Sequence, residues 1–204
     1  RILSGFREAG IEHNTVVIYV TDHGAAFPRA KHTLYDAGLR TALIVRDPRL
    51  HDRGGERVAQ MVSNLDLYPT LFELANIEIP ESDPVHGSSM APLLTGSQAE
   101  GRTEVYGSFT YGQRSGMQYY TPMRCVRTER FKLIRNYTED PLYVDTGFVG
   151  RFAFERETLD SWPYFGNIRP ELELYDLNAD PWETSNLAHD ARQRDRVAQL
   201  DALL

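Results

Sequence analysis

The first hundred residues alternate between helical and strand patterns of apolar side chains. Apolar residues at positions 2, 3, 6, 9 and 11 have helical spacing, which predicts a helix over residues 2–10. Residues 15–21 form a continuous run rich in β-branched and aromatic side chains, so we expect a fully buried strand there. Residues 41–46 predict a second short strand, and residues 64–76 predict a helix with one leucine-rich face. This order of helices and buried strands indicates an α/β fold.

The pattern changes near residue 101, after a segment rich in proline, serine and glycine that spans residues 78–101. Strand patterns then occur at residues 103–109, 123–129, 130–136 and 172–177, and a tight hairpin is predicted at residues 127–130. An amphipathic helix is expected over residues 189–204, with Val197, Leu200, Leu203 and Leu204 on one side. We therefore expect two domains. Residues 1–100 belong to an α/β domain, and residues 101–204 form a smaller antiparallel β-sheet subdomain packed by a C-terminal helix.

The composition is that of an ordinary globular protein and argues against two classes of function. Hydrophobic residues make up 41% of the 204 residues and charged residues 25%. The net charge of −7 leaves no basic field for a nucleic acid, and no apolar stretch approaches the roughly 20 residues of a membrane span. Cys125, the single cysteine, cannot form an internal disulfide and is expected to be a packed strand residue. Because no capping residue precedes the first helical pattern, we expect the chain to start at a cut end.

Polar side chains that suit a metal and an anion follow the first strand pattern. The apolar run ends at Asp22 and His23, and ligands bind beyond the carboxyl ends of strands in open α/β sheets. Carboxylate oxygens and imidazole nitrogens both coordinate metals, and Lys31 adds a point charge that suits sulfate or phosphate. In the alternative interpretation, Asp22 caps the next turn and His23 packs at the end of the strand. Two adjacent residues do not complete a metal site, so further ligands would come from elsewhere in the fold.

Several segments, in the order in which they occur, resemble the sulfatase family of the alkaline-phosphatase-like superfamily. NTVVIYVTDHG, residues 14–24, is similar to a family strand that ends in Asp-Asn-Gly or Asp-His-Gly. KHTLYDAGLR, residues 31–40, resembles the pattern K-x-T-x-Y-E-G-G-x-R, with Asp36 in place of Glu and Ala37 in place of Gly. Further family segments are resembled by NLDLYPTLFELANIEIP, HGSSMAPLLTG, VRTERFKLIRN and ELYDLNADPWETSNLA. Within the family, FPRAKHTLY and YYTPMRCVRTERFKLIRN are most similar to the heparan N-sulfatase (sulfamidase) branch.

This resemblance implies a fold and roles for Asp22, His23 and Lys31, and two further side chains are candidates beside them. The fold is the C-terminal part of the alkaline-phosphatase-like sulfatase sheet with its helices. Asp22 matches a carboxylate ligand of the divalent metal, and His23 stands where the family has a second ligand. Lys31 matches a residue that contacts the sulfate oxygens. His32 and Arg124 are candidates for contact with an anionic sugar, the alternatives being a solvent-facing His32 and a surface ion pair for Arg124. Calcium is the usual family metal, whereas the imidazole of His23 suits manganese or another transition metal better.

The nucleophile of the family is absent from this sequence. Sulfatases attack with a formylglycine made from the Cys or Ser of a C/S-x-P-x-R motif, and that motif does not occur here. The resemblance therefore implies part of an enzyme that hydrolyses sulfate esters or sulfamates of a sulfated sugar. The nucleophile would lie in a missing N-terminal half, and the chain alone is expected to be inactive because the nucleophile supplies the covalent step.

Two other functions stay open from the sequence. One is a phosphonate or phosphate monoester hydrolase of the same superfamily, for which His23 argues. The other is a non-catalytic domain that binds a metal or a sulfated glycan, for which the missing nucleophile argues. The resemblance suggests a periplasmic, secreted or lysosomal protein. A strand at residues 15–21 without its sheet neighbours would expose an apolar face, so we expect the chain to be prone to self-association.

Overall fold

The computed structural model describes residues 1–204 apart from residues 28, 98–100, 115–116 and 140–167. It consists of two compact units. The first comprises Arg1–Val20 and Ala42–Thr103, and the second comprises Thr21–Thr41 and Glu104–Leu204. The predicted domains, residues 1–100 and residues 101–204, refer to the complete enzyme, and this division stays a prediction. The compact units differ from it because residues 21–41 belong to the second unit.

The first unit combines a two-stranded sheet with short helices. Helix α1 (Ile2–Glu8) and the 3-10 helix η1 (Glu12–Asn14) precede strand β1 (Val17–Val20), which pairs antiparallel with β2 (Leu43–Arg46). The helices η2 (Pro48–Arg53), η3 (Asn64–Asp66), α3 (Leu67–Ala75) and α4 (Ala91–Thr95) follow. The helices predicted over residues 2–10 and 64–76 and the strand predicted over residues 41–46 are therefore confirmed, with their ends shifted by a few residues.

The prediction that residues 15–21 form a fully buried strand is wrong for this chain. Tyr19 and Ile44 lie opposite each other in the β1–β2 pair, and their side chains are 56% and 63% exposed. A continuous apolar strand is buried only where other elements cover both faces of its sheet. In the described part of the chain, β1 has β2 as its sole strand neighbour. The expected exposed apolar face is therefore present.

A buried carboxylate, Asp66, connects distant segments of the first unit. It forms a capping box with Ser63 and accepts a hydrogen bond from the Ser63 amide at 2.8 Å. The Ser88 amide also donates to Asp66 at 2.8 Å, and the Nε of Arg102 donates at 2.9 Å. Because these partners lie far apart in the sequence, one side chain fixes the start of η3 and α3 to two later segments.

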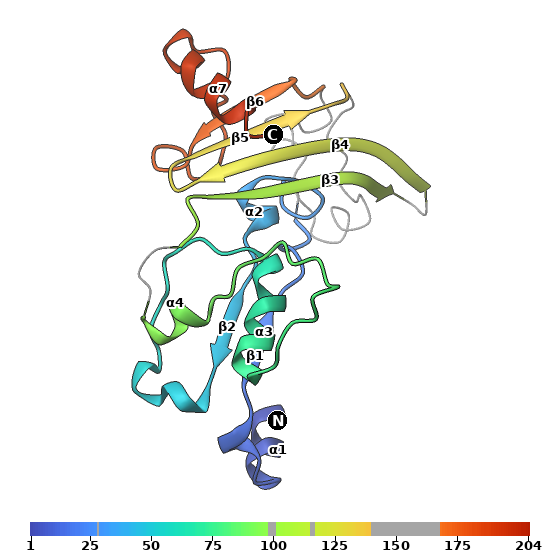
Figure 1. Ribbon diagram of the computed structural model, residues 1–204. Coiled ribbons are helices and arrows are strands. Elements are labelled where there is room, and N and C mark those ends of the chain that lie inside the picture. The colour runs from blue at the N-terminus through green and yellow to red at the C-terminus, as the bar shows by residue number, and fades with distance from the viewer. Residues whose placement is uncertain (28, 98–100, 115–116, 140–167) are drawn as a thin grey trace. The chain divides into compact units, whose positions relative to one another are not determined.

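The second unit is a four-stranded antiparallel sheet with covered faces (Figure 1). Its strands lie in the order β3 (Glu104–Arg114), β4 (Met117–Thr128), β5 (Phe131–Asn136) and β6 (Leu172–Asp176). The β4–β5 hairpin places Arg127 opposite Lys132, which confirms the predicted hairpin and antiparallel sheet. Residues 21–41, which include α2 (Asp36–Leu39), pack on one face, and η4 (Ala191–Gln193) with α7 (Arg194–Asp201) follow at the end of the chain.

The two faces of this sheet carry separate apolar cores. Neighbouring residues of a strand point to opposite faces, so Cys125 contributes to one core and Val126 to the other. The first core joins residues 21–41 to the sheet through Leu34, Tyr35, Met123, Cys125, Ile134, Tyr175 and Leu177. The second core joins α7 to the sheet through Val126, Phe131, Leu133, Leu174 and Leu200. Cys125 is 1% exposed, as predicted, and burial raises the pKa of its thiol to about 11.

The C-terminal helix follows its predicted stripe except at one position. Leu200 is buried, and Val197 and Leu204 pack against the second core. Leu203 is 45% exposed, so its predicted place on the buried side is wrong. Helix α7 ends at Asp201, so Leu203 and Leu204 both lie beyond the helical repeat, and of the two only Leu204 packs against the second core. Within the described residues, the structure contains no helix of the length and apolar character that a membrane crossing requires.

Three aspartates that pair with arginines should make the protein less stable in acid. Hydrogen bonds from a nearby arginine hold the pKa of Asp47, Asp176 and Asp190 below the ordinary aspartate value, and that of Asp190 is about 2. Between these values and the unfolded-state pKa of about 3.9, the unfolded chain binds more protons than the folded chain. The free energy of unfolding should therefore fall as the pH drops from about 4 toward 2. Urea unfolding across this range measures the effect, and Asp176→Asn should make it shallower. A free energy of unfolding that stays constant below pH 4 would contradict the prediction.

The exposed β1–β2 face predicts self-association of the 204-residue chain. Ile44→Lys places a charge on the face that Ile44 shares with Tyr19. Burying an isoleucine contributes about 1.5–3 kcal/mol, so we expect an association constant at least roughly tenfold weaker. Sedimentation velocity measures this, with Leu203→Lys as the matched control because Leu203 is also an exposed apolar residue. Equal association of both variants would show that the face is not the contact surface.

Candidate functional site

Four of the five predicted site residues lie in or next to one loop that two glycines, Gly24 and Gly38, close at its base. Lys31 and His32 lie between the glycines, and Asp22 and His23 directly precede Gly24. The Gly24 amide donates a hydrogen bond to the Gly38 carbonyl oxygen at 2.8 Å. A Cβ atom at Gly24 would lie 1.8 Å from the carbonyl oxygen of Ala37, and one at Gly38 would lie 2.3 Å from that of Ala30. Only glycine permits such close approaches of backbone to backbone. The sequence therefore returns to nearly the same point after fourteen residues, and the loop between the glycines presents its side chains from a fixed base.

Asp22 and His23 lie at the start of this segment and contact each other. The Asp22 side chain is 84% exposed, and its Oδ2 lies 3.3 Å from Nε2 of His23. The other ring nitrogen of His23, Nδ1, lies 2.7 Å from the Gly24 carbonyl oxygen. A proton on Nδ1 would donate to that carbonyl and leave the lone pair of Nε2 for a metal.

The spacing of these two ligand atoms suits a divalent cation. Neighbouring ligands at right angles around a cation lie about 2.8–3.7 Å apart for metal–ligand distances of about 2.0–2.6 Å. The separation of Oδ2 of Asp22 and Nε2 of His23 falls in this range. The described residues contain no group of three or more histidine, cysteine, aspartate or glutamate side chains that could hold a metal. This part of the chain therefore offers two ligands and not a whole coordination shell.

Lys31 and His32 lie farther along the same loop. The Lys31 amide donates to the Ala25 carbonyl oxygen at 3.1 Å, and no carboxylate among the described residues pairs with the Lys31 ammonium. His32 has a left-handed backbone with φ of 67°, and its ring lies 5.7 Å from that of Phe109 on β3. Such a backbone costs a non-glycine residue about 1–2 kcal/mol and persists only where the surroundings fix it. Lys31 therefore directly precedes a backbone position that its surroundings fix, and Lys31 itself is partly exposed.

The residues after His32 are buried and anchor the loop on the sheet. The hydroxyl of Tyr35 donates to Glu173 on β6 at 2.8 Å. Asp36 pairs with Lys132 of β5 at 2.5 Å and with Arg127 of β4 at 3.2 Å. Burial alone would raise the pKa of Asp36, but the two cations outweigh it and hold that pKa below its ordinary value. The loop thus consists of an accessible part with the candidate ligands and a buried, ion-paired anchor.

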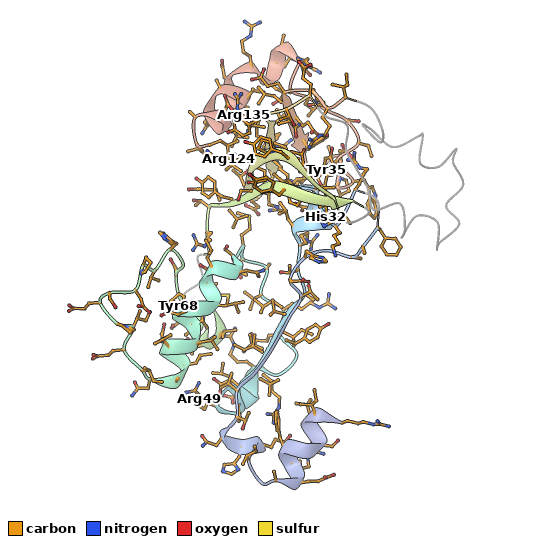
Figure 2. The ribbon with its side chains drawn as sticks, turned by 90° about the vertical axis from the view of Figure 1, so that its right-hand side faces the viewer. His32, Tyr35, Arg49, Tyr68, Arg124 and Arg135 are labelled. Atoms are coloured by element: carbon orange, nitrogen blue, oxygen red, sulfur yellow. The ribbon has the colours of Figure 1, made fainter. Side chains whose placement is uncertain are left out.

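The structure does not bring Arg124 together with the other candidates. Arg124 lies on β4 next to Cys125, so its side chain points to the opposite face from residues 21–41. Its Nη1 donates to the carbonyl oxygen of Leu204 at 3.3 Å, and its guanidinium lies 5.7 Å from the Tyr137 ring. Arg124, His32 and Tyr35 are labelled in Figure 2, where Arg124 lies apart from His32.

Sequence reasoning missed the buried charges beneath the loop. In the sequence Asp36 stands out only as a departure from a family pattern, and no local pattern predicts the roles of Lys132, Glu173 and Glu183. All four are less than 10% exposed. The available signal is a charged residue in an otherwise apolar strand, as Lys132 is in FKLI and Glu173 is in LELY. Charged residues are almost never fully buried unless they are paired, so each such position calls for a partner.

Comparison with known proteins shows which family this chain resembles. The family model described as "N-sulphoglucosamine sulphohydrolase, C-terminal" matches residues 25–144. N-sulphoglucosamine sulphohydrolase of Homo sapiens is 32% identical over 209 residues, which cover 94% of this chain and 41% of that protein. A solved 2-O GAG sulfatase is 25% identical with a TM-score of 0.70, over 99% of this chain and 38% of that one. A phosphonate monoester hydrolase of Agrobacterium radiobacter is 21% identical with a TM-score of 0.69, over 100% of this chain and 36% of that one.

These matches confirm the predicted α/β fold and the resemblance to the alkaline-phosphatase-like sulfatases. The chain spans between about a third and two fifths of the length of the curated relatives it matches. The family model covers Lys31, His32 and Arg124, and its match begins after Asp22 and His23. Because the model matches more than half of the 204 residues, the chain belongs to the family of N-sulphoglucosamine sulphohydrolase C-terminal domains, within the sulfatases.

Proposed function

We propose that this chain supplies part of the active site of a sulfatase that hydrolyses sulfate esters or sulfamates of a sulfated sugar. The observation that carries the proposal is the family match, because it includes the constrained loop that presents Lys31. The formylglycine nucleophile would lie in another part of the enzyme, so this chain by itself would not complete a turnover.

Each residue of the loop has a separate task in this proposal. Asp22 and His23 would hold a divalent metal, which when bound neutralises negative charge on the sulfuryl oxygens. Calcium is favoured by the family, and the imidazole of His23 also accommodates manganese or another transition metal. The Lys31 ammonium would stabilise the charge that develops on the same oxygens, and a constrained backbone favours this because no reorganisation is needed during the reaction. His32, next to Lys31 in the sequence, would contact the anionic sugar of the substrate. Arg124 lies on the other sheet face, so its contact with an anionic sugar would be a separate one.

A phosphonate or phosphate monoester hydrolase is the second candidate. The fold is shared with a phosphonate monoester hydrolase, and His23 adds a nitrogen ligand where calcium prefers oxygen. A non-catalytic metal- or glycan-binding domain remains the third. The proposal has two further parts. The enzyme would be periplasmic, secreted or lysosomal, and this chain would work together with the N-terminal half of the same enzyme.

Lys31→Ala in the complete enzyme should lower kcat/KM for its preferred sulfated substrate by about 10²- to 10³-fold, because a charge-stabilising donor is lost. The assay compares sulfate ester, sulfamate and phosphonate ester substrates. Arg192→Ala, which removes an 87% exposed cation from the same unit, should leave turnover unchanged. Unchanged sulfate turnover in Lys31→Ala would remove Lys31 from the proposal, and a preference for the phosphonate ester would establish the second candidate.

Asp22→Ala should weaken divalent metal binding by about 10-fold or more, since a charged ligand is removed from the first coordination shell. Isothermal titration of the complete enzyme with calcium and with manganese measures this. Asp190→Ala is the control, because Asp190 pairs with Arg192 in the same unit and is not a proposed ligand. Equal affinity of Asp22→Ala and the unmodified enzyme for both metals would exclude Asp22 as a ligand.

A further inference from the structure

Both ends of the segment that carries Lys31 bind the same residue, Glu183. At one end, Nη2 of Arg29 donates to the Glu183 backbone carbonyl oxygen at 2.6 Å. At the other end, the Asp36 amide donates to Oε2 of the Glu183 side chain at 2.6 Å. Lys31 lies between these two points of attachment. A single residue from the loop after β6 therefore fixes the span from Arg29 to Asp36.

The Glu183 carboxylate is itself held in place by Lys132. Its Oε1 lies 2.8 Å from Nζ of Lys132, whose side chain is fully buried, and the same ammonium pairs with Asp36. Glu183 is 2% exposed. A buried carboxylate with two charged or amide partners has little freedom to rotate, so the attachment of Asp36 is rigid.

The backbone of Glu183 is also constrained. It has a left-handed φ of 57°, which only a locally over-determined turn maintains in a glutamate. Asp180 provides that turn: its backbone carbonyl accepts from the Glu183 amide at 3.1 Å, and its carboxylate accepts from the Ser185 amide at 2.7 Å. The carbonyl oxygen that binds Arg29 is therefore presented by a fixed turn.

Arg29 completes the attachment by packing as well as by hydrogen bonding. Its guanidinium lies 3.8 Å from the centroid of the Tyr35 ring, and Arg29 is 8% exposed. Arg29 shares with His32 a left-handed backbone, with φ of 58°. The two strained positions flank Lys31, and the contacts of Glu183 enclose both of them. Strain of this kind is retained where surrounding contacts enforce it.

We propose that Glu183 is a positioning residue that holds Arg29 and Asp36 at a fixed separation and thereby places the Lys31 ammonium. This inference rests on the proposed function of Lys31. Glu183 does not touch the substrate, and its effect on catalysis passes through the backbone of residues 29–36. Misplacement of a reacting or stabilising group by about 1 Å is enough to cost about 10²-fold in rate.

The test is a double-mutant cycle in the complete enzyme between Glu183→Gln and Lys31→Ala. Glutamine keeps the size of the side chain and an acceptor for the Asp36 amide but loses the charge that faces Lys132. Glu183→Gln should lower kcat/KM by about 10- to 100-fold when Lys31 is present and by less than about 2-fold when Lys31 is alanine. Arg29→Lys, which shortens the reach to the Glu183 carbonyl and leaves the buried carboxylates paired, should show the same non-additivity. Glu171→Gln is the matched control, because Glu171 pairs with Arg135 in the same sheet but is 72% exposed.

The outcomes separate a positioning role from a general structural role. Equal losses in the presence and absence of Lys31 would overturn the inference, because they would show that Glu183 stabilises the fold without acting through Lys31. Full activity of Glu183→Gln, with Lys31→Ala impaired, would overturn the inference and leave the proposed function intact.

A second measurement judges Glu183 even if Lys31→Ala proves fully active and the proposed role of Lys31 fails. Amide hydrogen exchange at residues 29–36 should be at least about tenfold faster in Glu183→Gln and unchanged in Glu171→Gln. Unchanged exchange in Glu183→Gln would show that Glu183 does not hold the segment.

Discussion

The second unit depends on the buried ammonium of Lys132. This side chain is fully buried on β5, and its charge is compensated by Asp36 from the loop and Glu183 from the turn after β6. An uncompensated charge there would cost several kcal/mol, and removing one partner of a buried pair typically costs about 3–5 kcal/mol. A displacement of the loop or of the turn would therefore leave the buried Lys132 charge without one of its partners.

The two faces of the sheet make different kinds of contact: mainly apolar packing on one, and apolar packing combined with buried polar contacts on the other. The face toward α7 contributes apolar packing through residues such as Leu133 and Leu174, together with a partly exposed ion pair between Arg135 and Asp201 of the helix. The face toward residues 21–41 combines apolar contacts with hydrogen-bonded charges, among them Glu173, which accepts from the hydroxyls of Tyr35 and Tyr175. Apolar packing alone tolerates small shifts, whereas directed hydrogen bonds between buried groups specify one arrangement. The buried polar contacts among Asp36, Lys132, Glu173 and Glu183 therefore occur on the face where a loop with little regular structure has to be held in one conformation.

Much of this architecture could be predicted from local sequence patterns. The strands and the hairpin of the second unit follow from alternating apolar residues, and the terminal helix follows from its stripe. The burial of residues 15–21 could not be predicted in this way, because the burial of Tyr19 depends on which elements cover the sheet and not on the residue itself. The chemical types of the candidate ligands were visible in Asp22, His23 and Lys31. The anchoring role of Asp36 was not, because its partners Lys132 and Glu183 lie about 100 and 150 residues away, and no local pattern specifies a contact over such separations.

The glycines at 24 and 38 have a consequence for how such a loop can diverge. Neither position has room for a side chain, whereas position 37 carries an alanine where the family pattern has glycine. The points at which the loop closes are therefore fixed by backbone contact, while part of its content is free to change. Divergence can accordingly alter the residues offered between the two glycines without altering where the loop begins and ends. The same backbone scaffold is in this way retained while the side chains that the loop presents change.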